Sequence, residues 1–90
     1  MVAKTLKFNV PSFALKANAP DSITLDNQDN GIPHNLEILD KEGGNVIVPG
    51  VAPFNGIAKK MWNFQAPKPG TYYFQCIVHP TTMNGQVIFQ

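Results

Sequence analysis

Short segments in which apolar and polar residues alternate recur along this chain, and residues that favour turns separate them. A period of two places the apolar side chains on one face of an extended strand, whereas a helix has a period near 3.6. The segments that fit a strand are residues 5–10, 13–16, 22–26, 34–39, 57–64, 71–76 and 86–90. We therefore expect an all-β fold, a Greek-key β-sandwich or barrel of about six to eight strands.

Two regions need a separate interpretation. Residues 46–56 are apolar but contain two prolines and two glycines, so we expect a long irregular connection there rather than one strand. Residues 58–61, Ala-Lys-Lys-Met, have good helix propensity, and a short helix is the alternative to a strand at residues 57–64.

The length of 90 residues predicts one domain spanning the chain, with a small core. A chain of this size buries about 60–65% of its unfolded surface, so a disulfide cross-link or a bound metal ion would add useful stability. A single cysteine cannot form an internal disulfide, so a bound metal is the remaining way to cross-link the fold. The formal net charge of +1 argues against a nucleic-acid partner. No apolar run approaches the roughly 18–20 residues of a membrane span.

The charged residues are unevenly distributed along the sequence. All the acidic residues lie between Asp21 and Glu42, and lysines flank them on both sides, which could shape an encounter surface without identifying a partner. Lys4 and Lys7 are followed by alternation rather than by an apolar core segment, so we expect no signal peptide. The chain is then either cytoplasmic or a mature or excised form.

Residues 70–85 contain most of the candidate chemistry. They include the only cysteine, Cys76, followed by His79 and Met83. Thiolate, imidazole and thioether are ligands that favour copper over magnesium or calcium. A site of the blue-copper kind needs two imidazoles, one thiolate and a weak axial thioether. The only other histidine is His34, which must supply the second imidazole.

Strand parity places both Cys76 and His34 on inward faces. Cys76 shares its face with the aromatic residues two and four positions before it, and His34 shares its face with the apolar residues two and four positions after it. A thiolate buried among apolar residues is costly unless a cation neutralises it. Each of these residues, considered singly, has a plainer role than that of a metal ligand. Cys76 could be a small buried hydrophobic residue, His34 a hydrogen-bonded residue at a strand end, and Met83 a core residue. Their coincidence favours a metal site, for which zinc is an alternative occupant.

The segment from Gly70 to Phe89 resembles the carboxy-terminal ligand loop of the cupredoxins, the small type 1 copper proteins. Residues 70–80 meet the pattern Gly-x-Tyr-x-Phe-x-Cys-x-x-His-Pro found in plastocyanin, pseudoazurin and amicyanin. Residues 83–89 resemble the Met-x-Gly-x-Val-x-Val ending of these proteins. Upstream, residues 25–27 and the run Pro33-His34-Asn35 resemble the segment that carries the first histidine.

The resemblance implies that the three equatorial copper ligands are His34, Cys76 and His79. It implies that Met83 is the axial ligand. Asn35 matches the asparagine that joins the two ligand segments and hydrogen-bonds near the thiolate, although an amide that only stabilises a turn is the plainer alternative. Met61 lies in a separate segment and is a poor axial candidate. The spacing between His79 and Met83 is shorter than in plastocyanin and pseudoazurin and longer than in amicyanin.

Four protein ligands leave no open position for a substrate, so we expect no enzyme activity. The chain also has too few histidines for a multicopper oxidase or a copper nitrite reductase, and no second cysteine for a binuclear centre. We expect a one-electron carrier that cycles one copper ion between Cu(I) and Cu(II). The alternatives are a copper storage or delivery module, and an excised sandwich domain of a larger redox protein, with or without metal.

In the family, electrons enter and leave through the exposed edge of the ligand that corresponds to His79. The expected docking surface is an apolar patch around it, formed by Ile32, Pro33, Pro80 and the pair Pro53-Phe54. Pro53 and Phe54 could instead cover the end of the sandwich. We expect a monomer that binds a redox protein transiently. Lys59 and Lys60 could favour an acidic partner, or simply form a solvated strand face. The resemblance implies a periplasmic, extracellular or lumenal location.

Overall fold

The computed structural model describes residues 1–90 and has no helix, so no helix in it could cross a membrane. The strands are β1 (Val2–Lys4), β2 (Lys7–Phe8), β3 (Ser12–Leu15), β4 (Pro20–Asn27), β5 (Pro33–His34), β6 (Glu37–Leu39), β7 (Val46–Val48), β8 (Phe54–Asn55), β9 (Ala58–Gln65), β10 (Gly70–Gln75) and β11 (Asn84–Phe89). Three of these, β2, β5 and β8, have only two residues each. The all-β prediction is confirmed, and the helical alternative for residues 57–64 is wrong.

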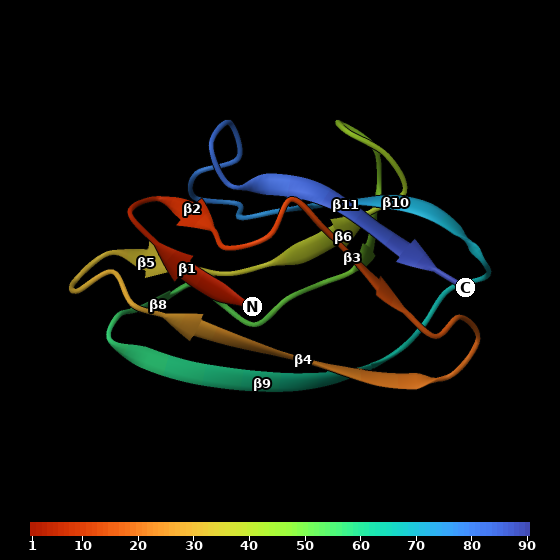
Figure 1. The fold of residues 1–90 in the computed structure, drawn as a ribbon, viewed down its shortest axis with the longest axis horizontal. Coiled ribbons are helices and arrows are strands. Elements are labelled where there is room, and N and C mark those ends of the chain that lie inside the picture. Colours follow the sequence, from red (N-terminus) through yellow and green to blue (C-terminus); the bar gives the residue numbers. More distant parts are fainter.

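The longer strands form two sheets packed face to face (Figure 1). One sheet has the order β2-β1-β4-β9 and the other β3-β11-β10-β6-β7. The pairs β1–β4 and β3–β11 are parallel, whereas the other pairs in these two sheets are antiparallel. A small third sheet, β5-β8, lies at one end of the sandwich, where the turn between β1 and β2 also lies (Figure 1).

The core lies between the two sheets and is built by alternation. On β4, Ile23 and Leu25 are buried while their neighbours Ser22 and Thr24 are exposed. On β10, the inward side chains predicted from parity are buried, and the ring of Phe74 is fully enclosed between Phe8 and Phe13. The inner faces of two sheets interdigitate in this way in a β-sandwich.

The expected strand at residues 5–10 is wrong in its detail. The chain instead reverses at Thr5 and Leu6, whose φ angles are 56° and 57°, so that β1 and β2 form a hairpin. Positive φ is uncommon for residues with a side chain and needs support from the surrounding structure. Asp29 supplies that support, because its carboxylate accepts the main-chain N–H groups of Thr5 at 2.6 Å and Leu6 at 3.0 Å.

Two other segments differ in detail from the predicted strands. Residues 34–39 are divided between β5, which ends at His34, and β6, which begins at Glu37. Residues 46–56 form the expected irregular connection, although they contain the short strands β7 and β8.

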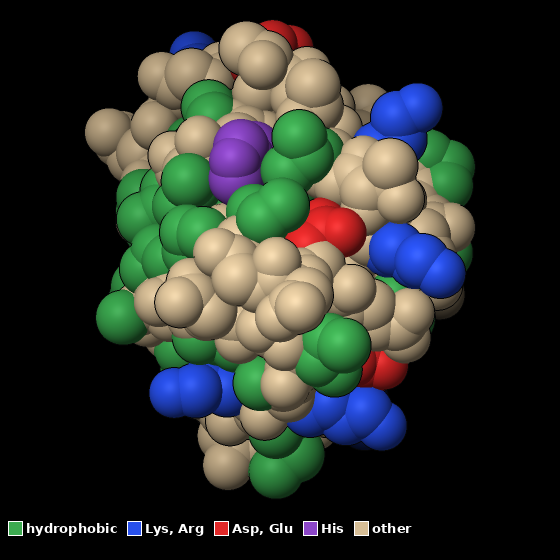
Figure 2. Space-filling model, turned by 90° about the vertical axis from the view of Figure 1, so that its left-hand side faces the viewer, with side chains coloured by type: hydrophobic (Ala, Val, Ile, Leu, Met, Phe, Trp, Pro, Cys, Tyr) green, Lys and Arg blue, Asp and Glu red, His purple; other side chains and the backbone are tan.

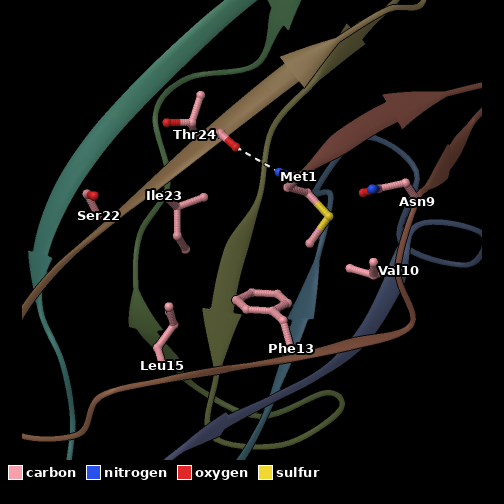
Figure 3. Close-up of a pocket in the computed structure, with 8 residues that line it drawn as sticks. All are labelled: Met1, Asn9, Val10, Phe13, Leu15, Ser22, Ile23 and Thr24. Atoms are coloured by element: carbon pink, nitrogen blue, oxygen red, sulfur yellow. Dashed lines mark hydrogen bonds between the residues drawn. The ribbon is translucent and has the colours of Figure 1, made fainter.

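A cavity of about 240 Å³ opens between the two sheets on one side (Figure 3). Its lining residues are Met1, Asn9, Val10, Phe13, Leu15, Ser22, Ile23 and Thr24. The side chains of Met1, Phe13 and Ile23 point into this space, and the amino group of Met1 donates a hydrogen bond to the carbonyl oxygen of Thr24 at 3.3 Å (Figure 3). None of the candidate metal ligands lines this cavity.

Candidate metal centre

The structure brings His34, Cys76 and His79 together at one end of the sandwich. One ligand atom from each residue lies within 4.8 Å of the other two. The Sγ atom of Cys76 is 3.9 Å from Nδ1 of His34, and the two imidazole rings have centroids 5.1 Å apart at an angle of 67°. His34 and Cys76 are fully buried, whereas His79 is partly exposed. Residues more than 40 positions apart in the sequence thus form one cluster.

Strand pairing explains how His34 and Cys76 reach the same place. In the five-stranded sheet, Phe74 of β10 pairs with Ile38 of β6, and Gln75 pairs with Glu37. Cys76 follows β10 directly, on the face that carries the buried Phe74 side chain. His34 precedes β6 and is held in β5 by its pairing with Phe54 of β8. The antiparallel register therefore places the end of β10 beside the start of β6.

Met83 closes the loop that contains Cys76 and His79. Its side chain is fully buried, as expected from the sequence. The main-chain N–H of Met83 donates to the carbonyl oxygen of His79, and the N–H of Cys76 donates to the carbonyl oxygen of Met83, both at 2.9 Å. These hydrogen bonds keep the three residues of the loop close together. Met61 is 63% exposed on β9, in agreement with its dismissal as an axial ligand.

Asn35 joins the two segments that supply the candidate ligands. Its side-chain Oδ1 accepts the main-chain N–H of Ile77 at 3.0 Å, and its Nδ2 donates to the carbonyl oxygen of Val51 at 3.2 Å. Asn35 follows His34, and Ile77 follows Cys76, so this single side chain fixes the relative position of both. The asparagine bridge implied by the resemblance is present, and it extends beyond a local turn.

One residue of the centre, Asp29, was not identified from the sequence. Its Oδ2 is 2.6 Å from Nε2 of His34, and the residue is only 9% exposed. Burial alone would raise the pKa of this carboxyl, but hydrogen bonds from Leu6, His34 and Thr5 lower it below the ordinary value. The composition of residues 27–31, Asn-Gln-Asp-Asn-Gly, is typical of turns and gives no sign of this contact.

The donor atoms in this cluster fit a soft or borderline cation. The Nδ1 atom of His79 is buried and has no hydrogen-bond partner, which is unusual for a buried polar atom and fits a metal ligand. Cys76 is a free, buried thiol beside it. One thiolate, two imidazoles and a neighbouring thioether form a donor set that suits copper, and the cysteine and histidines also suit zinc.

The exposed edge of His79 lies among apolar side chains. Figure 2 shows this end of the molecule, where the single visible histidine is surrounded mainly by hydrophobic side chains. Its neighbours in sequence, Ile77, Val78 and Pro80, are all exposed. Of the other expected patch residues, Pro53 is exposed and Ile32 and Pro33 are half-buried. Phe54 is only 8% exposed and belongs to the core, so its expected place in the patch is wrong, because it covers the end of the sandwich.

Comparisons of the whole chain with known proteins identify the fold. No family model and no curated protein matches the sequence. Among solved structures, auracyanin B is 23% identical, with a TM-score of 0.83 over 99% of this chain and 85% of its own. Auracyanin A, described as a "blue" copper protein from Chloroflexus aurantiacus, is 19% identical, with a TM-score of 0.83 over 98% of this chain and 92% of its own.

A reduced Cu(I) form of an amicyanin variant is also similar. It is 20% identical, with a TM-score of 0.69 over 99% of this chain and 78% of its own. These likenesses extend over nearly the whole chain and show that it has the cupredoxin fold. The protein therefore resembles cupredoxins in its whole fold as well as in the sequence of the candidate ligand loop.

Proposed function

We propose that this protein is a mononuclear type 1 copper protein that carries one electron at a time between redox partners. The observation that carries the proposal is the convergence of His34, Cys76 and His79 within 4.8 Å, in a cupredoxin fold. These three residues are the proposed equatorial ligands, and Met83 is the proposed axial ligand. When bound, copper supplies a one-electron Cu(I)/Cu(II) couple.

The scaffold suits a carrier because it restrains the ligands. β5 holds His34, the end of β10 holds Cys76, and Asn35 fixes the distance between their segments. Restrained ligands rearrange little when the charge of the metal changes, which favours rapid electron exchange. Four protein ligands would also leave no open position for a substrate, so we assign no enzyme activity to the site.

Electron exchange is assigned to the exposed edge of His79. This edge lies among hydrophobic side chains (Figure 2), and its exposed apolar neighbours in sequence are Ile77, Val78 and Pro80. A small apolar surface suits brief docking of a redox protein to a monomeric carrier. A periplasmic, extracellular or lumenal location is part of this proposal. Storage or delivery of copper is less well supported, because His34, Cys76 and Met83 are all fully buried and offer no ready route for ligand exchange.

Copper(II) titration followed by visible absorption and EPR spectroscopy tests the proposal. We expect an intense thiolate-to-copper band that saturates at about one equivalent and disappears on reduction. Cys76→Ser should abolish the band. Met83→Leu should change the spectrum, whereas the matched control Met61→Leu, at an exposed position on β9, should leave it unchanged. The same weak spectrum from the wild type and Cys76→Ser would refute the ligand assignment, and a preference for zinc with no copper band would refute the redox role.

A further inference from the structure

We propose that Asp29 is a positioning residue for the metal centre, which orients His34 through its outer nitrogen and adds a negative charge that favours Cu(II) over Cu(I). The inference deepens the proposed function and rests on it. The observation behind it is the contact of 2.6 Å between Oδ2 of Asp29 and Nε2 of His34, both in the buried interior.

The direction of this hydrogen bond follows from the other contacts of the carboxylate. Both carboxylate oxygens of Asp29 accept main-chain N–H groups, Oδ1 from Thr5 and Oδ2 from Leu6, so this carboxylate acts as a hydrogen-bond acceptor. The proton must therefore reside on Nε2 of His34. A neutral imidazole with its proton on Nε2 presents the lone pair of Nδ1. In this structure Nδ1 is the nitrogen that faces Sγ of Cys76, at 3.9 Å.

Asp29 is itself held firmly. Its main-chain N–H donates to Oδ1 of Asn27 at 2.9 Å. The Nδ2 of Asn27 donates to the carbonyl oxygens of Ile32 at 2.9 Å and Phe54 at 2.8 Å, and Asn27 is fully buried. This network connects the loop that carries Asp29 to both β5 and β8. A carboxylate fixed in this way can orient an imidazole, as outer partners of metal-bound histidines do.

The negative charge of Asp29 lies beside the proposed metal ligand His34. His34 is the only basic side chain within ion-pair distance of this carboxylate, so no lysine neutralises it. A buried anion beside a ligand stabilises the higher metal charge, because screening is weak away from water. Asp29 should thus lower the reduction potential of the centre.

The competing interpretation is that Asp29 only stabilises the β1–β2 turn. The two roles differ in what they affect. A residue that only holds the turn would change stability and leave the tautomer of His34 and the reduction potential unaltered. A positioning residue would change all three.

Asp29→Asn tests the proposal, with Asp26→Asn as the matched control. Asp26 lies on β4 and its carboxylate accepts Nε2 of Gln28, not His34, so the control removes the same charge elsewhere. In Asp29→Asn, the affinity for Cu(I) relative to the affinity for Cu(II) should rise about tenfold. This change corresponds to a rise of about 59 mV in the one-electron reduction potential. Asp26→Asn should shift the ratio less than about twofold. Equal shifts in both variants would overturn the proposal.

The tautomer of His34 in the metal-free wild type gives an independent result. Its ¹⁵N chemical shifts should show a protonated Nε2 and an unprotonated Nδ1. The opposite tautomer would overturn the proposal even if Asp29→Asn does not fold. This measurement uses no copper, so it also separates the two hypotheses: absence of the thiolate–copper band refutes the proposed function, whereas the wrong tautomer refutes the role of Asp29.

Discussion

The side-chain oxygen of Asn35 accepts the main-chain N–H of Ile77 at 3.0 Å, and this bond connects the neighbours of His34 and Cys76. Because Asn35 is only 3% exposed, removing its amide would leave the N–H of Ile77 without a partner in a partly buried site.

We expect Asn35→Ala to lower the free energy of unfolding of the metal-free protein by about 1–3 kcal/mol. Loss of bound copper to a chelator should also become faster, because the two ligand segments are no longer joined. Denaturant unfolding and stopped-flow chelation measure these effects. The control is Asn63→Ala, at an exposed position on β9. Unchanged stability and chelation rate in Asn35→Ala would show that the bridge is dispensable.

Gly56→Ala should disturb the loop that carries Asp29. A Cβ atom at position 56 would collide with the main-chain carbonyl of Asp29 and approach that of Asn27 to 2.9 Å. The loop would have to shift, at a cost of about 1–3 kcal/mol in the free energy of unfolding. Thermal unfolding measures the cost, and Asn55→Ala, at an exposed neighbouring position, is the control. Wild-type stability in Gly56→Ala would contradict the tight packing described for this loop.

A charge in the apolar surface around His79 should slow electron exchange without altering the copper spectrum. Val78→Glu and Pro80→Glu place a carboxylate in that surface, where it would have to be desolvated in the docked complex. Exchange rates with a redox partner or between two copies, measured by NMR line broadening, should fall about tenfold. Val46→Glu, at an exposed position of β7, serves as the control. Equal rates in all variants would remove this surface from the docking site.

Phe54→Glu should behave differently, because Phe54 belongs to the core. Truncation of a buried phenylalanine alone costs about 3–5 kcal/mol, and the unpaired carboxylate adds to that cost. We therefore expect Phe54→Glu to be largely unfolded when free of metal, as measured by circular dichroism. A folded variant that has only lost exchange activity would return Phe54 to the docking surface.

The lowered pKa of Asp29 predicts how stability depends on pH. In the unfolded chain this carboxyl titrates near its ordinary value of 3.8, and in the folded chain it titrates lower. Its contribution to stability is thus fully present above 3.8 and is lost as the pH falls through the folded pKa. Metal-free wild type should therefore exceed Asp29→Asn in free energy of unfolding at pH 6, and the difference should shrink at acid pH. A difference that is constant from neutral to acid pH would contradict this linkage.

The fold class and the inward direction of Cys76 and His34 were predictable because their signals are local. Alternation on β10 fixes the inward direction of Cys76, and the same parity places His34 inward. Cys76, His79 and Met83 also lie close in sequence, so a short loop is enough to bring them together. Residue types and spacing identify the candidate ligands, whereas the distant pairing of β6 with β10 brings His34 beside Cys76.

Asp29 and the turn at Thr5 and Leu6 were not predictable in the same way. The alternation of residues 5–10 is consistent with one strand, and it is a carboxylate more than 20 positions away that stabilises the positive φ angles. Likewise, Phe54 lies in a segment whose prolines and glycines suggest exposure, but its pairing with His34 draws it into the core. Contacts between distant segments decide these positions, and the local sequence pattern does not contain them.

Strand β9 is eight residues long, pairs only with β4 and forms one edge of its sheet. An edge of that length offers free main-chain N–H and C=O groups to any other extended chain, which is a route to aggregation. Lys59 and Lys60 are both exposed on it, so that a second β9 brought alongside would meet a row of like charges. Repulsion between these lysines would disfavour extension of the sheet through another copy of the protein, an effect that needs no redox partner.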